Sequence, residues 1–144
     1  MRKFKWTDAH AVHIPDIDSE HQALFQLCAD LQCAITRDAP ASQVAEIFQE
    51  LAGHIVGHFS HEEGQMRAAR YSLYQWHRRQ HQAARSRVTL LGRRIRRGER
   101  DAALELLEFL SGWLHDHIRL PDRMLAAYLR NRQRALIALA ARAS

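Results

Sequence analysis

The sequence predicts an all-α protein, an antiparallel up-down-up-down four-helix bundle with an N-terminal arm and a C-terminal helical extension. Apolar residues repeat at intervals of three and four in four separate segments, which is the spacing of amphipathic helices. The connections between these segments are short, so neighbouring helices must run antiparallel. With 144 residues and a hydrophobic fraction of 47%, the chain can bury one core of ordinary size. We expect the bundle to occupy residues 1–130 and a basic, alanine-rich helical tail to occupy residues 131–144.

The chain is basic, and arginine supplies almost all of the positive charge. Lys and Arg together number 21 against 16 Asp and Glu, and the only lysines are Lys3 and Lys5. Many of the arginines gather between residues 78 and 100. Such a surface can attract nucleic acid, an acidic protein or a membrane surface, or it can simply be solvated. Because no aromatic residues for base stacking are interleaved there, we expect no nucleic-acid partner.

The sequence shows no sign of export or of membrane insertion. Polar residues, rather than an apolar run, follow the first charged residues, which is unlike a signal peptide. No uninterrupted apolar stretch reaches the roughly 20 residues that a membrane span requires. Cys28 and Cys33 are five residues apart in one predicted helix, so they point to different faces and are not expected to form a disulfide. These features predict a cytoplasmic protein without a membrane span.

The first helix is expected to follow an arm that ends at Pro15. Asp18 is a plausible N-cap, because its carboxylate can accept a free backbone N–H of the first turn. This start would place His21 in the first turn of the helix. The core-facing stripe of the helix begins with His21 itself and continues through Leu24, Phe25, Cys28, Leu31 and Ile35.

The second helix is expected to run from Ser42, a candidate N-cap, to about Met66. Its core-facing stripe contains Val44, Ile47, Phe48, Leu51, Ile55, His58, Phe59, Glu62 and Met66. His58 and Glu62 are four residues apart, so they project from one side of the helix. Burying an unpartnered imidazole or carboxylate costs roughly several kcal/mol, and the pair therefore indicates hydrogen-bond partners or a metal.

The third and fourth helices also carry histidines in their apolar stripes. The third stripe contains His77, His81, Ala84, Val88, Leu91 and Ile95, and the fourth contains Ala103, Leu106, Leu107, Leu110, Trp113, Leu114 and His117. Pro121 lacks a backbone donor, so the fourth helix is expected to break or kink near Leu120, and this break can turn Asp122 back towards the bundle. Because neighbouring helices alternate in direction, the polar residues of all four stripes fall at the same end.

Five imidazoles and two carboxylates are therefore expected to converge inside one bundle. They are His21, His58, Glu62, His77, His81, His117 and Asp122. This set is too large for one metal ion, whereas two six-coordinate ions that share both carboxylates and one solvent-derived bridge would leave a single position open. Imidazole with carboxylate suits iron or manganese, and the absence of a thiolate set argues against structural zinc. The pattern predicts a buried dinuclear metal site.

With these residues, the chain resembles the bacterial hemerythrins from Trp6 to about Leu129. The matching motifs are Ile17-Asp18-Ser19-Glu20-His21, His58-Phe59 followed by Glu62-Glu63 and Met66, His77-x-x-x-His81, and Trp113-Leu114-x-x-His117-Ile118-x-x-x-Asp122. The resemblance implies two iron ions with an oxo or hydroxo bridge. It also implies the ligands of each ion, with Glu62 and Asp122 bridging, His77, His81 and His117 on one iron, and His21 and His58 on the other. The open position then belongs to the two-histidine iron.

The same resemblance implies reversible O2 binding for carriage, storage or delivery, without enzymatic turnover. The apolar residues that match those around the oxygen site are Phe59, Trp113, Leu114 and Ile118, which would equally serve as ordinary core. Oxygen or redox sensing through the same site, iron handling and O2 reduction remain as alternatives. The tail can pack on the bundle, mediate self-association or bind an acidic protein, and the sequence does not choose among these.

Several other histidines lie outside this pattern. His13 stands where glycine is usual in the family before the first helix, and His54 stands where tyrosine is common four residues before His58. His54 can either line the site or lie on a mixed helix face. His61 and His115 are expected to point outward.

Overall fold

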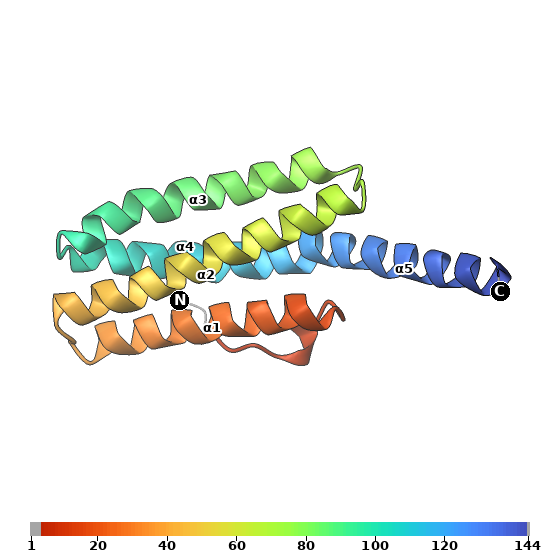
Figure 1. The fold of residues 1–144 in the computed structure, drawn as a ribbon. Coiled ribbons are helices and arrows are strands. Elements are labelled where there is room, and N and C mark those ends of the chain that lie inside the picture. The colour runs from red at the N-terminus through yellow and green to blue at the C-terminus, as the bar shows by residue number, and fades with distance from the viewer. Residues whose placement is uncertain (1–3, 144) are drawn as a thin grey trace.

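The computed structural model describes residues 4–143, and residues 1–3 and 144 of the two predicted domains lie outside this range. Helices α1 to α4 form the body of the molecule (Figure 1). The elements are η1 (Asp8–His10), α1 (Pro15–Thr36), α2 (Ala41–Ala68), α3 (Tyr74–Arg96), α4 (Arg100–His117), η2 (Ile118–Asp122) and α5 (Arg123–Ala143). No strand occurs among the described residues. The predicted all-α class is confirmed.

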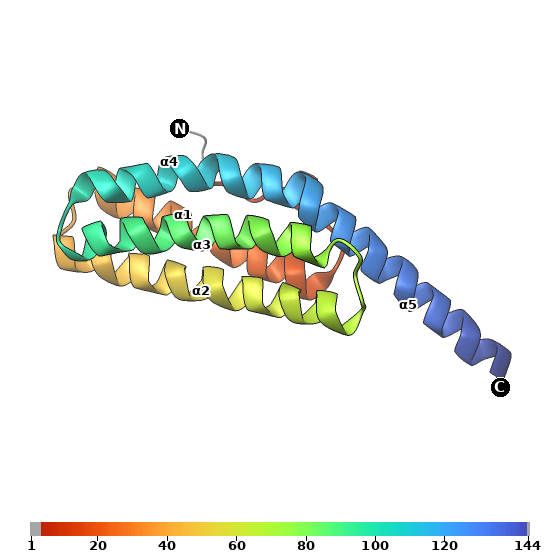
Figure 2. The same cartoon turned by 90° about the horizontal axis from the view of Figure 1, so that it is seen from above.

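The four long helices form an antiparallel bundle around one apolar core. Short connections at residues 37–40, 69–73 and 97–99 reverse the chain between successive helices (Figures 1 and 2). Helix α4 packs against both α3 and α1, which closes the bundle. Residues from all four predicted stripes are fully buried, among them Leu24, Leu31, Phe48, Leu51, Leu91, Leu106, Leu107 and Leu110. The predicted four-helix bundle is therefore confirmed.

Helix α1 begins earlier than the sequence predicted, and Asp18 is not its N-cap. Pro15 occupies the start of the helix, where its missing N–H leaves no intrahelical bond unmade. The Asp18 carboxylate instead accepts hydrogen bonds from the backbone N–H groups of Val12, at 2.8 Å, and His13, at 3.1 Å. These bonds tie the N-terminal arm to α1. His13 has a φ of 64°, in the left-handed region that glycine adopts without steric cost.

Helix α2 also begins before its expected cap. The carbonyl oxygen of Pro40 accepts the backbone N–H groups of Gln43 and Val44, at 3.0 and 3.1 Å. The first turn therefore closes on Pro40, and Ser42 lies inside the helix rather than at its N-cap.

Gly92 allows α3 to approach α2 closely. A Cβ atom here would lie 2.5 Å from Cζ and 2.8 Å from Cε1 of Phe48, whose ring is enclosed by the core. We expect Gly92→Ala to lower the free energy of unfolding by about 1–2 kcal/mol, because overpacking costs about 1–3 kcal/mol and alanine regains up to about 1 kcal/mol of helix propensity. Urea unfolding measures the change. Gly53→Ala is the control, since its Cβ would meet nothing within 4 Å; a loss of stability as large in Gly53→Ala would contradict this explanation.

The fourth helix does not break near Leu120. It passes through a π-helical turn, η2, directly into α5, and the helix axis bends there (Figure 2). Pro121 lies inside this wider turn, which relieves the clash that proline makes with the preceding turn of an α-helix. Hydrogen bonds of a π-helix join residues five apart, so His117 and Asp122 lie on the same face. The irregularity predicted near Leu120 is thus a bend through a π-turn rather than a break, and it brings Asp122 beside His117.

Helix α5 leaves the bundle and projects beyond it (Figures 1 and 2). Leu125 is buried in the bundle, whereas residues 131–143 are all exposed. The apolar side chains of Leu136, Ile137 and Leu139 are among them, at 50%, 62% and 59% exposure. These side chains are therefore not buried against the bundle of their own chain. No helix in the described part of the chain has the length and apolar composition needed to cross a membrane.

Candidate metal centre

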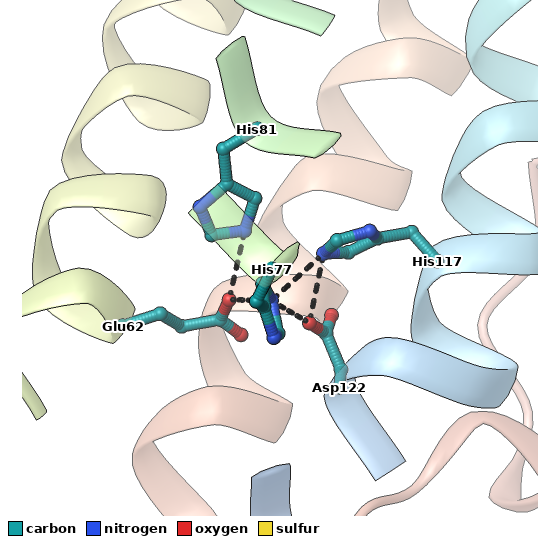
Figure 3. Close-up of side chains that lie close together, drawn as sticks. All are labelled: Glu62, His77, His81, His117 and Asp122. Atoms are coloured by element: carbon teal, nitrogen blue, oxygen red, sulfur yellow. Dashed lines mark hydrogen bonds and ion pairs between the residues drawn. The ribbon is translucent and has the colours of Figure 1, made fainter. Parts of the chain in front are cut away.

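The structure brings together the six polar residues of the four stripes and Asp122, which are the seven predicted ligands. Each is at most 4% exposed, so protein encloses the cluster. Helix α1 supplies His21, α2 supplies His58 and Glu62, α3 supplies His77 and His81, α4 supplies His117, and the π-turn supplies Asp122. In Figure 3 the ends of five of these side chains point towards one another.

Three imidazoles gather around one oxygen of each carboxylate. His77 Nε2 lies 3.3 Å from Glu62 Oε2 and 3.1 Å from Asp122 Oδ1. His81 Nε2 lies 3.1 Å from Glu62 Oε2, and His117 Nε2 lies 3.0 Å from Asp122 Oδ1. These five residues form the three-histidine group (Figure 3).

The other oxygen of each carboxylate faces a second, smaller group. His21 Nε2 lies 3.0 Å from Asp122 Oδ2, and His58 Nε2 lies 3.2 Å from Glu62 Oε1. The two Nε2 atoms are 3.1 Å apart. These four residues form the two-histidine group. Glu62 and Asp122 therefore each present one oxygen to each group, which is the geometry of bridging carboxylates.

The unsatisfied polar atoms of the cluster fit bound cations. All four carboxylate oxygens of Glu62 and Asp122 are buried and accept no hydrogen bond of acceptable geometry, and His81 Nε2 is also unpaired. Burying such groups costs free energy unless a cation lies between them. Within each group, the candidate ligand atoms all lie within 4.8 Å of one another. The cluster is thus able to hold metal, and its imidazole and carboxylate donors suit iron.

Electrostatic interactions keep the carboxylates in the form that binds metal. Burial by itself would favour neutral acids, but the surrounding histidines hold the pKa of Glu62 and of Asp122 well below the usual values. Burial likewise opposes the charged imidazoles, yet Glu62 and Glu20 raise the pKa of His58 to about 10, and Asp122 and Glu62 raise the pKa of His77 to about 9. At neutral pH, metal binding is therefore expected to displace a proton from His58 and from His77.

Two further carboxylates support the cluster, and sequence reasoning assigned them no role. His58 donates from Nδ1 to Glu20 Oε2 at 3.0 Å, and His81 donates from Nδ1 to Glu63 Oε2 at 3.1 Å. Each bond leaves the Nε2 lone pair of its imidazole facing the cluster. The available signal was their position, since Glu20 precedes His21 and Glu63 follows Glu62 in the sequence.

The apolar residues matched to an oxygen site lie against the three-histidine group. Phe59 stacks on the ring of His81, with centroids 4.0 Å apart and planes 7° apart. Trp113 stacks on His117 in the same way, at 4.3 Å and 11°. Phe59 also lies 6.0 Å from the His58 ring. Leu114 and Ile118, both buried, belong to the same apolar cluster.

The remaining histidines of the bundle are not in the cluster. His54 is exposed, so it does not line the site. The His61 side chain is 39% exposed, and its Nδ1 lies 2.5 Å from Glu20 Oε1. His115 is half-buried, and its ring lies 6.0 Å from that of His10. Of these, only His61 is linked to the cluster, through Glu20.

Comparison with known proteins agrees with this geometry. A family model described as the hemerythrin HHE cation binding domain matches residues 12–129. The chain is 33% identical over 126 residues to a bacteriohemerythrin of Stenotrophomonas maltophilia, covering 88% of this chain and 81% of that protein. It is 32% identical over 122 residues to one from Pseudomonas aeruginosa, with coverage of 85% and 78%. It is 25% identical over 124 residues to one from Clostridium acetobutylicum, with coverage of 83% and 96%. The matched region includes every residue of the cluster, and the chain belongs to the hemerythrin family, whose members bind non-haem iron.

Proposed function

We propose that this chain binds O2 reversibly at a di-iron centre, as a carrier, store or delivery protein rather than an enzyme. The observation that carries the proposal is the unequal pair of ligand groups. Both share Glu62 and Asp122, but one has three imidazoles and the other has two. With one solvent-derived bridge, six-coordinate ions would then leave one position free, on the two-histidine side. One free position accommodates O2 and leaves no room for a substrate beside it.

The chain's own residues would hold the ions and limit the access of water. Two ferrous ions bound there would supply the electrons that O2 accepts. Neutral imidazoles, which outnumber the carboxylates, favour the ferrous state over the ferric state. Phe59 and Trp113 cover the rings of His81 and His117, and the Phe59 ring also lies 6.0 Å from the His58 ring, so an apolar side chain lies beside the two-histidine group as well. A dry shell of this kind hinders the loss of bound oxygen.

Iron content and a visible spectrum test the proposal. The spectrum is recorded on the reduced protein without O2, after O2 is added, and after O2 is removed. We expect both groups to hold iron and a charge-transfer band to appear with O2 and disappear without it. An irreversible change to a ferric form after one exposure would overturn reversible binding. Continuous O2 consumption with added reductant would overturn the carrier function in favour of O2 reduction.

Oxygen or redox sensing is the second candidate, and the continuity of η2 with α5 favours it. Asp122 is the last residue of the π-turn, and Arg123 begins the helix that projects from the bundle. A change at the metal centre that moved Asp122 would therefore act directly on α5. Sensing predicts that oxidation state alters the proteolysis of residues 131–143 or the oligomeric state measured by light scattering. Identical results in both oxidation states would rule out this output.

A further inference from the structure

The Nδ1 atoms of the five clustered imidazoles differ in their hydrogen bonding. The Nδ1 atoms of His21, His77 and His117 are buried without a hydrogen-bond partner. His58 and His81 instead donate to carboxylates, and one of them belongs to each ligand group. Each group therefore contains one imidazole whose orientation and tautomer are fixed by a carboxylate.

The two supporting carboxylates differ in their own surroundings. Glu63 lies 2.7 Å from Arg85 and 3.4 Å from Arg78, so two guanidinium groups offset its charge. Among the ion pairs of residues 4–143, Glu20 contacts only His58 and His61, and no arginine or lysine of this range lies within 4.0 Å of its carboxylate. Its side chain is 29% exposed, whereas that of Glu63 is 7% exposed. Within the described part of the chain, no guanidinium therefore pairs with the charge of Glu20.

We propose that Glu20 is a positioning residue that retains the metal ion of the two-histidine group, where it offsets the absence of a third imidazole. The inference rests on the proposed di-iron site. A carboxylate that accepts Nδ1–H holds the ring with Nε2 towards the ion and makes this nitrogen a stronger donor. Because arginines offset the charge of Glu63, its effect on the three-histidine ion is weaker. The smaller ligand group thus has the outer carboxylate that pairs with no guanidinium of the described residues.

Ferrous iron binding to the metal-free protein, measured without O2 by chelator competition and by iron analysis after desalting, tests this role. Glu20→Gln is expected to weaken the two-histidine ion about 10–100-fold, as loss of outer hydrogen-bond partners does in other metal sites, while the three-histidine ion remains. Asp16→Asn is the matched control, since it removes one exposed carboxylate from the same helix. Glu20→Asp keeps the charge and is expected to lose less affinity than Glu20→Gln.

A second comparison shows whether Glu20 acts through His58. In a His58→Ala background, Glu20→Gln is expected to change nothing further, whereas Glu63→Gln is expected to weaken the remaining ion. Unchanged affinity of both ions in Glu20→Gln, or equal weakening of both, would overturn the positioning role. If the parent protein itself bound only one ion, the di-iron proposal would fail first. The parent titration therefore separates the two failures.

Discussion

Replacing Glu62 with glutamine is expected to remove both metal ions from the protein. Glu62 faces His58 through Oε1 and His77 and His81 through Oε2, so one substitution removes a charged ligand from both groups. Loss of outer hydrogen-bond partners alone typically costs about 10–100-fold in metal affinity, and loss of a direct anionic ligand is expected to cost more. Iron per chain after desalting measures the effect. His21→Ala, which touches only the two-histidine group, is expected to remove one ion.

Glu46→Gln is the control for this substitution. Glu46 is exposed on the same helix, so the variant loses the same charge without touching the cluster. Circular dichroism of the metal-free proteins establishes that each variant is helical. Retention of both ions in Glu62→Gln would show that this carboxylate is not shared. Retention of one ion would show that it serves a single group.

Removing both iron ions is expected to lower the thermal unfolding temperature by about 25–30 °C. Each ion stabilises the folded chain by about 4 kcal/mol when its free concentration is about 1,000 times its Kd, and each kcal/mol shifts the unfolding temperature of a chain this size by about 3–4 °C. The metal-free state also keeps buried carboxylate oxygens without hydrogen-bond donors. Far-UV circular dichroism of iron-loaded and chelator-treated protein measures the shift.

The Glu62→Gln variant shows whether iron raises the unfolding temperature by binding to this cluster. If iron stabilises the fold through this cluster, the chelator should leave the unfolding temperature of Glu62→Gln almost unchanged. An equal shift in the variant and the parent would place the stabilising metal elsewhere. A parent protein that unfolds at the same temperature with and without iron would contradict the expectation directly.

Periodicity predicted the helices well, and their ends less well. Each apolar stripe is defined by many side chains that become buried on folding, such as Phe48, Leu91 and Leu110, so no single residue decides whether the helix is recognised. A helix start depends on a few local bonds that compete with one another. Asp18 has the chemistry of an N-cap, but Pro15 starts the helix and the Asp18 carboxylate binds the arm instead. Several residues suited a helix start, and only the folded arm determined which was used.

The convergence of the candidate ligands followed from the sequence because helix direction alternates in a bundle. His21, His58, His77 and His117 lie at positions along their helices that this alternation places side by side. Asp122 was harder to place, since a five-residue separation from His117 does not suit an α-helix. Pro121 indicated an irregularity near Leu120. Both a break in the helix and a π-turn accommodate a residue that lacks a backbone N–H. The packing of α5 after the turn decides in favour of the continuous helix.

By itself, the sequence determined the bundle, its seven clustered polar residues and its family, because each depends on residue type and on the period of the α-helix. The tertiary structure alone decided what touches the outer side of that cluster. Glu20 reaches His58 from another helix, and Glu63 reaches His81 and is held by Arg85. It also decided that α5 projects from the bundle. These features depend on the distances between helices, which no spacing along one chain segment specifies.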